Sequence, residues 1–263
     1  MKITVLTENT SSNPALKSEH GLSLFIETEK HNILFDSGQT DLFFENAQKL
    51  GVDLKSVDIA ILSHGHYDHG GGLLKFFKIN DKASVYINEH SFQKFLSGYE
   101  KDISIDTSIK DSDRVIVTGD FTKIDDDLTL CTCNQEKKNY FFDSFGLNTV
   151  LNGQIVPDTF LHEQYLTINE NGKKIVFSGC SHKGILNIVD WLSPDVLIGG
   201  FHLKKLDTCG EDTEILNDVA KKLLSFNSTY YTCHCTGEKQ YSYLKELMAD
   251  RLNYMSTGCI IKL

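Results

Sequence analysis

The amino-acid sequence predicts an α/β or α+β fold in which helices cover β-sheets. Short apolar segments rich in β-branched residues alternate with segments whose apolar residues recur at helical spacing, and turn-forming residues separate them. Of the 263 residues, 40% are hydrophobic and 24% are charged. This composition is close to that of globular domains, so it excludes disordered and fibrous architectures.

The first third of the chain alternates predicted strands and helices. Strands are expected at 2–6, 22–28, 32–35, 57–62 and 83–87. A helix is expected over 40–51, where Gly51 fits the C-terminal cap, and another over 70–79 after a glycine cluster. This βαβ alternation implies sheets with helices packed on them.

The middle of the chain, about 89–165, is less regular. A helix is expected over 89–99, and strands over 115–119, 127–133 and 140–145. The segment is interpreted either as a β-rich wall of the same domain or as a substrate-covering insertion. Regular alternation returns with strands at 173–177, 195–200, 229–233 and 259–263 and helices at 185–192, 213–226 and 239–249.

Charge and cysteine content exclude several classes of protein. Asp and Glu number 36 against 26 Lys and Arg, a net charge of −10, which argues against a nucleic-acid or anionic-membrane partner. No apolar run approaches the ~20 residues that span a bilayer. Seven cysteines without a secretory signal favour reduced thiols. We therefore expect a cytoplasmic protein with a small-molecule partner, and the oligomeric state stays open.

Five predicted strands end beside side chains of the metal-ligand type. These are Asp36, the block SHGHYDHGGG at 63–72, the segment from Cys180 to His182, His202, and the segment from Cys233 to Cys235. Rigid strands that deliver polar groups to one sheet edge are how α/β proteins build sites. Five such ends favour a metal site over isolated structural histidines.

The block at 63–72 carries the strongest signal, with three histidines and one aspartate within six residues. His64 and His66 alternate, so both can face one metal, whereas Asp68 and His69 can face a second. Imidazole and carboxylate ligands suit zinc, which we expect first, or manganese or iron. Two such ions roughly 3.5–4 Å apart can hold a bridging hydroxide. A single structural zinc would leave the distal histidines unexplained.

These motifs resemble the metallo-β-lactamase superfamily, to which H-x-H-x-D-H at 64–69 after a D-x-G turn is specific. Within it, the chain is similar to the metal-dependent hydrolases that include the archaeal dihydropterin ribofuranosylaminobenzene phosphate synthases. The similar elements are EHGLS (19–23), LFDSGQT (34–40), SGCSHKGILN (178–187), GGFHL (199–203) and CHCTG (233–237). The resemblance runs from 2 to 262. It implies a single domain, 1–263, folded as a four-layer αββα sandwich with the site at one edge.

The resemblance also implies a set of ligands. His64 and His66 would bind one metal, and Asp68, His69 and His234 the other. Asp36 matches the carboxylate that orients ligand imidazoles. Cys180 stands where many members have a bridging aspartate, which makes it a candidate ligand. Many members also have a further ligand histidine before that position, and here it is expected to be His182, with His162 and Glu163 as alternatives.

Other residues receive looser assignments. His202 is interpreted as a substrate contact or a proton donor, and Glu19 and His20 as loop residues within reach of the site. Asp120 is interpreted as part of a turn. The C-x-C pairs at 131–133 and 233–235 are expected to have no ligand role, because alternate residues of a strand share a face without any metal.

The chemistry predicts an enzyme, a metal-dependent hydrolase in which a metal-held hydroxide attacks a phosphoester, ester or lactone. Two divalent cations bring four positive charges, of which Asp68 and a hydroxide offset half. A Cys180 thiolate or an anionic substrate would offset more, so we expect an anionic substrate. The resemblance adds an alternative, a transferase like the dihydropterin synthases of methanopterin-type biosynthesis.

Overall fold

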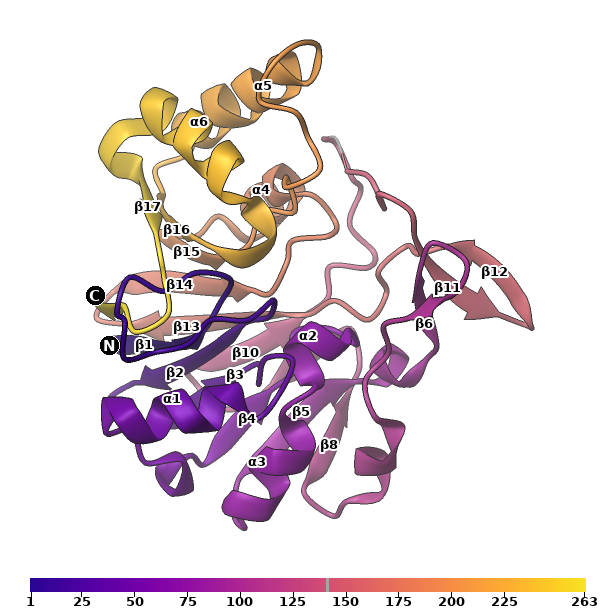
Figure 1. The fold of residues 1–263 in the computed structure, drawn as a ribbon, viewed down its shortest axis with the longest axis vertical. Helices are drawn as coiled ribbons and strands as arrows, with labels where there is room; N and C mark the ends of the chain where they lie inside the picture. The colour runs from indigo at the N-terminus through magenta and orange to yellow at the C-terminus, as the bar shows by residue number, and fades with distance from the viewer. Residues whose placement is uncertain (141) are drawn as a thin grey trace.

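The computed structural model describes residues 1–140 and 142–263, in which two seven-stranded sheets lie face to face between helices (Figure 1). The first sheet contains, in spatial order, β18 (Ile260–Lys262), β1 (Lys2–Thr7), β2 (Ser23–Glu27), β3 (Asn32–Phe35), β4 (Ile59–Ile61), β5 (Ser84–Asn88) and β8 (Val115–Thr118). The second contains β17 (Leu252–Tyr254), β16 (Thr229–Thr232), β15 (Val196–Gly199), β14 (Lys173–Ser178), β13 (Tyr165–Glu170), β10 (Leu128–Cys131) and β9 (Phe121–Lys123).

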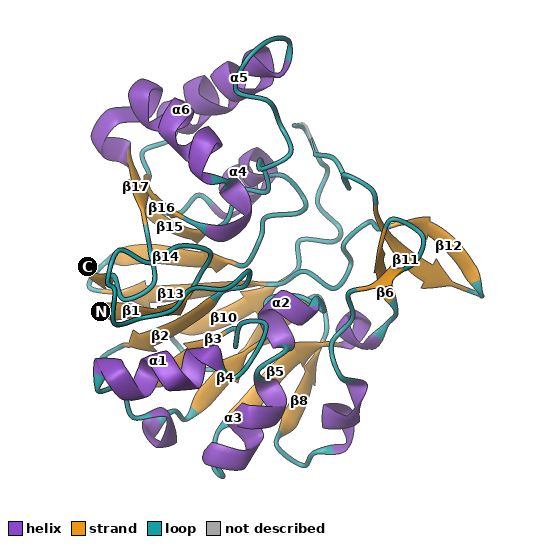
Figure 2. Ribbon diagram, viewed as in Figure 1, coloured by secondary structure: helices purple, strands orange, loops and turns teal. Residues whose placement is uncertain are grey.

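Helices cover the outer face of each sheet (Figure 2). The first sheet carries α1 (Leu42–Leu50) and α3 (Leu73–Ile79), with the single turn α2 (Tyr67–Gly70) at its edge. The second carries α4 (Ile185–Leu192), α5 (Asp212–Ser225) and α6 (Glu238–Met248). Helix α1 ends as predicted at Gly51, which adopts the left-handed conformation at φ 70°. None of the helices in the described part of the chain is long and apolar enough to cross a membrane.

Successive side chains of a strand point to opposite faces of its sheet, so the hydrophobic core forms three layers. In β3, Ile33 and Phe35 face the space between the sheets, whereas Leu34 faces the helices. Phe35 meets Phe177 of the opposite sheet with ring centroids 5.8 Å apart. Outer layers lie under α1 and α3 and under α4 to α6. The structure therefore confirms the predicted α/β class and its four-layer αββα arrangement.

A third, four-stranded sheet projects from one end of the molecule (Figure 1). It contains β12 (Gln154–Pro157), β11 (Leu147–Leu151), β6 (Phe95–Ser97) and β7 (Lys101–Asp102). The helix predicted over 89–99 is wrong: only a 3₁₀ turn forms at Glu89–Phe92, and β6 follows. Phe95 and Leu96 are buried by pairing with β11, a contact distant in sequence that overrides the helical pattern.

Other connections also differ from the predicted elements. The strand predicted over 140–145 includes Phe141, which lies outside the described residues, and the described residues around it form no strand. Strands β13 and β17 were not predicted, although β13 is central to the second sheet. Further 3₁₀ turns lie at Leu54–Ser56, Thr107–Asp111, His234–Thr236 and Ala249–Arg251.

We predict that Phe177→Ala destabilises the protein, because Phe177 is fully buried between the two sheets. Removing a buried phenyl ring leaves a cavity and costs about 3–5 kcal/mol. Urea unfolding followed by circular dichroism measures the change. Phe121→Ala, at a ring that is 66% exposed, is the matched control and should cost about 0.5 kcal/mol or less. Equal losses in the two variants would contradict the described core.

Candidate metal centre

The predicted site residues converge where strands of both sheets end. Strands β3 and β4 are parallel, as are β14, β15 and β16, so the carboxyl ends of each set meet at one edge. Loops after these strands bring together the residues that the sequence singled out: Asp36, His64, His66, Asp68, His69, Cys180, His182, His202 and His234. Five sequence-distant segments therefore form one site.

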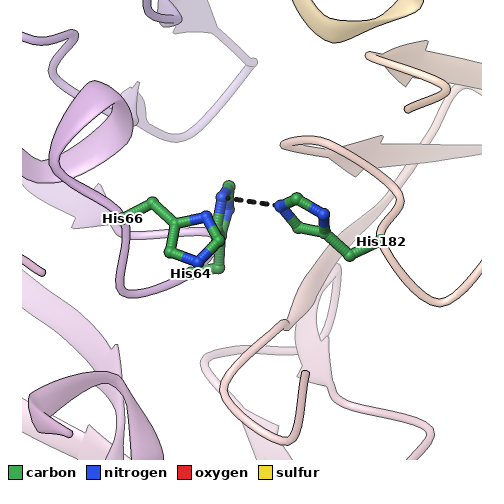
Figure 3. Close-up of side chains that lie close together, drawn as sticks. All are labelled: His64, His66 and His182. Atoms are coloured by element: carbon green, nitrogen blue, oxygen red, sulfur yellow. Dashed lines mark hydrogen bonds between the residues drawn. The ribbon is translucent and has the colours of Figure 1, made fainter. Parts of the chain in front are cut away.

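The first cluster consists of three buried histidines, His64, His66 and His182, whose ligand atoms lie within 4.8 Å of one another. Figure 3 shows His182 approaching His64 from the opposite side, with their Nε2 atoms 3.2 Å apart. Burial lowers the pKa of His64 and His182 well below the usual value and that of His66 to about 3. All three rings are therefore neutral at pH 7, the form that binds a cation.

The second cluster contains Asp68, His69 and His234. The Nε2 atoms of His69 and His234 are 3.2 Å apart, and Asp68 Oδ2 lies 3.4 Å from His234 Nε2 and 3.8 Å from His69 Nε2. Cys180 Sγ is 3.3 Å from His69 Nε2 and within 4.8 Å of a ring nitrogen of His64 and of His234. Cys180 thus lies between the clusters, the position of a bridging group. Its ligand role stays a prediction.

The protonation of the second cluster depends on its neighbours. Burial alone would lower the pKa of His69, but Asp36 and Asp68 outweigh it and raise the pKa to about 9. Burial would raise the pKa of Asp68, yet His69, His20 and His234 hold it well below its usual value. His20 was predicted to be a loop residue within reach of the site, and its Nε2 lies 3.2 Å from Asp68 Oδ2.

Asp36 connects the two clusters. Its carboxylate accepts hydrogen bonds from the Ser63 backbone N–H and hydroxyl, each at 2.7 Å, and pairs with His69 Nδ1 at 2.7 Å. The Ser63 hydroxyl also lies 2.8 Å from His64 Nδ1. These contacts orient one imidazole of each cluster. The role that the resemblance implies for Asp36 towards bound metal stays a prediction. A side chain at Gly179 would collide with Ser63, which explains the glycine at that position.

The candidates for the remaining ligand, His182, His162 and Glu163, have different contacts. His162 lies near His66, but its Nδ1 accepts from the Gly65 N–H at 2.8 Å and its Nε2 pairs with Asp158 at 3.0 Å. Both ring nitrogens of His162 are therefore in use. Glu163 instead accepts from the His182 backbone N–H at 2.7 Å. His182 is the residue that joins the first cluster, and its ligand role remains a prediction.

An unpaired ring nitrogen in the first cluster supports metal binding. His66 Nε2 is buried and has no hydrogen-bond partner within the described residues. A buried unpaired polar atom is costly. The donor set of imidazoles with one carboxylate and one thiol suits zinc and related divalent ions.

The sequence analysis did not identify Asn9 as a neighbour of the second cluster. Asn9 Oδ1 lies 2.8 Å from His234 Nδ1 and would fix the ring's orientation. The Sγ of Cys235, which was expected to have no ligand role, lies within 4.8 Å of the ligand-type atoms of Cys180 and His234. It already accepts a hydrogen bond from the His202 N–H and donates one to the Cys180 carbonyl. Asp120 belongs to neither cluster and accepts from the Thr132 hydroxyl, in keeping with a turn.

The clusters open on a cleft of about 410 Å³. The His182 and His202 rings lie in its wall with centroids 4.2 Å apart. Its cationic lining residues are Lys101, Lys204 and Lys205, and its large apolar and aromatic ones are Tyr67, Ile103, Phe145 and Leu147. The cleft therefore combines ligand-type groups with cationic and aromatic walls.

Comparison with known proteins agrees with this fold. The pattern of the metallo-beta-lactamase superfamily matches residues 18–131. MJ0448, an uncharacterized protein of Methanocaldococcus jannaschii, is 31% identical over 270 residues, covering 98% of this chain and 99% of the relative. The 7,8-dihydropterin-6-methyl-4-(beta-D-ribofuranosyl)-aminobenzene-5'-phosphate synthase of the same organism is 30% identical over 288 residues, covering 100% and 96%.

A solved structure extends the similarity. The crystal structure of Tm1679, a metal-dependent hydrolase of the beta-lactamase superfamily, matches with a TM-score of 0.85 and 28% identity over 100% of this chain and 99% of that one. The chain belongs to the metallo-beta-lactamase superfamily. The resemblance inferred from the sequence motifs is thereby confirmed.

We predict that filling the second cluster with Zn²⁺ releases a proton from His69. Its pKa of about 9 keeps the metal-free ring protonated at pH 7, and only the deprotonated nitrogen binds a cation. Affinity should therefore rise about tenfold per pH unit up to pH 9 and then level off. Calorimetric titration in buffers of different ionisation enthalpy measures the released protons.

Two variants separate the sources of these protons. Cys180→Ser removes any contribution from the thiol and should leave the His69 proton in place. Asp36→Asn removes a carboxylate that raises the His69 pKa and should reduce the release. No proton release in the Cys180→Ser protein at pH 7 would contradict the protonation described for His69.

Proposed function

We propose that the protein is a cytoplasmic, zinc-dependent hydrolase with a binuclear site, acting on a small anionic substrate of the phosphoester, ester or lactone type. The observation that carries this proposal is the pair of adjacent His/Asp clusters opening on one cleft with cationic walls. When bound, two divalent ions would activate a water molecule and polarise the bond under attack.

The surrounding residues supply orientation and proton transfer. Asp36 and Ser63 hold the His69 and His64 rings, so the ligand geometry is set before a cation binds. His202 reaches the cleft beside His182 with a buried, unpartnered Nε2. From there it can donate a proton to the leaving group, a step that contributes about 10²–10⁴-fold to rate in enzymes.

The lysines favour an anionic substrate. Lys101, Lys204 and Lys205 line the same cleft, whereas the whole chain carries a net charge of −10. Lys101 Nζ lies 3.3 Å from the Tyr67 hydroxyl, and Lys205 Nζ donates to the Phe145 carbonyl. A local concentration of positive charge in a cleft attracts anions from solution.

A second candidate is a transferase similar in activity to the dihydropterin ribofuranosylaminobenzene phosphate synthases. It is supported by the 30% identity to a relative of that name over the full chain. The aromatic walls at Tyr67 and Phe145 would suit a flat ring system. This reaction would release pyrophosphate or carbon dioxide with a pterin substrate and leave simple esters intact.

We predict that protein purified without a histidine tag contains one to two equivalents of zinc, manganese or iron. His66→Ala should remove most activity towards its substrate in a panel of phosphodiesters, phosphomonoesters, lactones, β-lactams and pterin pyrophosphates. His90→Ala, a histidine outside both clusters, is the matched control. Absence of metal, or activity that survives His66→Ala, would refute the proposed hydrolase.

We also predict that Lys101→Ala and Lys204→Ala each raise KM for an anionic substrate about two- to fivefold, as expected for a partly exposed charge. The effect should shrink as salt screens the charges. Lys221→Ala, on the exposed surface of α5, should leave KM unchanged. An equal rise in KM for a neutral ester would show that the lysines do not select anions.

A further inference from the structure

Two ligand-type histidines, His182 and His234, follow strands of the second sheet. The backbone N–H of each donates a hydrogen bond to a buried carboxyl group. The His182 N–H donates to Glu163 Oε1 at 2.7 Å, and the His234 N–H donates to Glu8 Oε2 at 3.2 Å. Both glutamates have fully buried side chains. Glu163 precedes β13 and Glu8 follows β1, so the two carboxylates come from different sheets.

Each glutamate also accepts a hydrogen bond from a tyrosine. The Tyr165 hydroxyl donates to Glu163 Oε2 at 2.6 Å, and the Tyr254 hydroxyl donates to Glu8 Oε2 at 3.2 Å. The same arrangement, a ligand-type histidine N–H and a tyrosine hydroxyl on one buried carboxylate, therefore occurs twice. No contact in the described residues links one pair to the other.

Each carboxylate also accepts further hydrogen bonds. Glu163 accepts from the Lys183 N–H at 3.1 Å, and Glu8 from the Thr10 N–H at 2.7 Å and the Thr10 hydroxyl. A buried polar group with several donors avoids most of the desolvation cost. Each pair therefore fixes one loop without occupying an imidazole nitrogen.

We propose that Glu163 with Tyr165 and Glu8 with Tyr254 are two independent positioning pairs, the first for the metal at His64, His66 and His182 and the second for the metal at Asp68, His69 and His234. This inference rests on the proposed function, since it presumes that both clusters bind metal. It adds that each metal position has its own determinant of affinity, from a different sheet.

The experiment measures stepwise Zn²⁺ binding by competition with a fluorescent chelator, in protein first stripped of metal. The two steps are assigned with His182→Ala and His234→Ala. Glu163→Gln should weaken the first position about 10–100-fold and the second less than about twofold, and Glu8→Gln should do the reverse. Tyr165→Phe and Tyr254→Phe should cause smaller losses at the same positions. Tyr230→Phe, which removes a buried hydroxyl bonded to the Leu223 carbonyl, is the matched control.

The outcomes separate a positioning role from a structural one. If a variant lowers the melting temperature of the metal-free protein but both affinities stay at the wild-type value, the pair is only structural and the inference fails. Equal weakening of both positions would also overturn it, because the pairs would not be independent. If Glu163→Gln does not fold, the tyrosine variants and Glu8→Gln decide. Wild-type protein that binds no metal would refute the proposed function as well, whereas two bound ions with insensitive variants would refute the positioning pairs alone.

Discussion

The buried carboxylate of Asp36 is the contact on which the geometry of the site depends. It is 1% exposed, and its donors are the Ser63 N–H, the Ser63 hydroxyl and His69 Nδ1. The Ser63 N–H is bonded to Oδ1, and the Ser63 hydroxyl and His69 share Oδ2, so neither carboxylate oxygen is left without a partner. Because Ser63 also contacts His64, one carboxylate fixes a ring in each cluster. The spacing between the clusters is therefore tied to the packing of β3 against β4.

Several residues at this edge have unfavourable backbone conformations. Asp36, Ser181, His202 and His234 adopt left-handed backbone at φ 58°, 59°, 53° and 50°. Each costs of order 1 kcal/mol or more in a residue with a side chain, and such costs persist where the surrounding structure enforces them. Here the strands that precede these residues are anchored in two sheets with a shared core. The core thus stabilises turns that the local sequence would not adopt alone.

The sequence predicted the parts of the molecule whose signals are local. The helix over 185–192 was predicted with its observed bounds, since its apolar pattern and its core contacts agree. The helix over 89–99 failed, because Phe95 pairs with β11 more than fifty residues away, which no local pattern records. The residues of the block at 63–72 followed from short-range spacing. The sequence left His162 and Glu163 open beside His182, because no local pattern records which ring nitrogens and carboxylate oxygens are already hydrogen-bonded in the fold.

The balance of charge changes once the buried carboxylates are counted. From the sequence, two divalent cations left an excess that only a Cys180 thiolate or an anionic substrate would offset. The structure adds three buried carboxyl groups, those of Asp36, Glu8 and Glu163. Each is hydrogen-bonded to a ring nitrogen or to the backbone N–H of a ligand-type histidine. Charges inside a protein interact more strongly with each other than charges in water do, even where they are not in contact. Burial raises the pKa of the Cys180 thiol well above its usual value, so the thiol ionises only beside a cation. In the structure, the case for an anionic substrate rests on the lysines of the cleft.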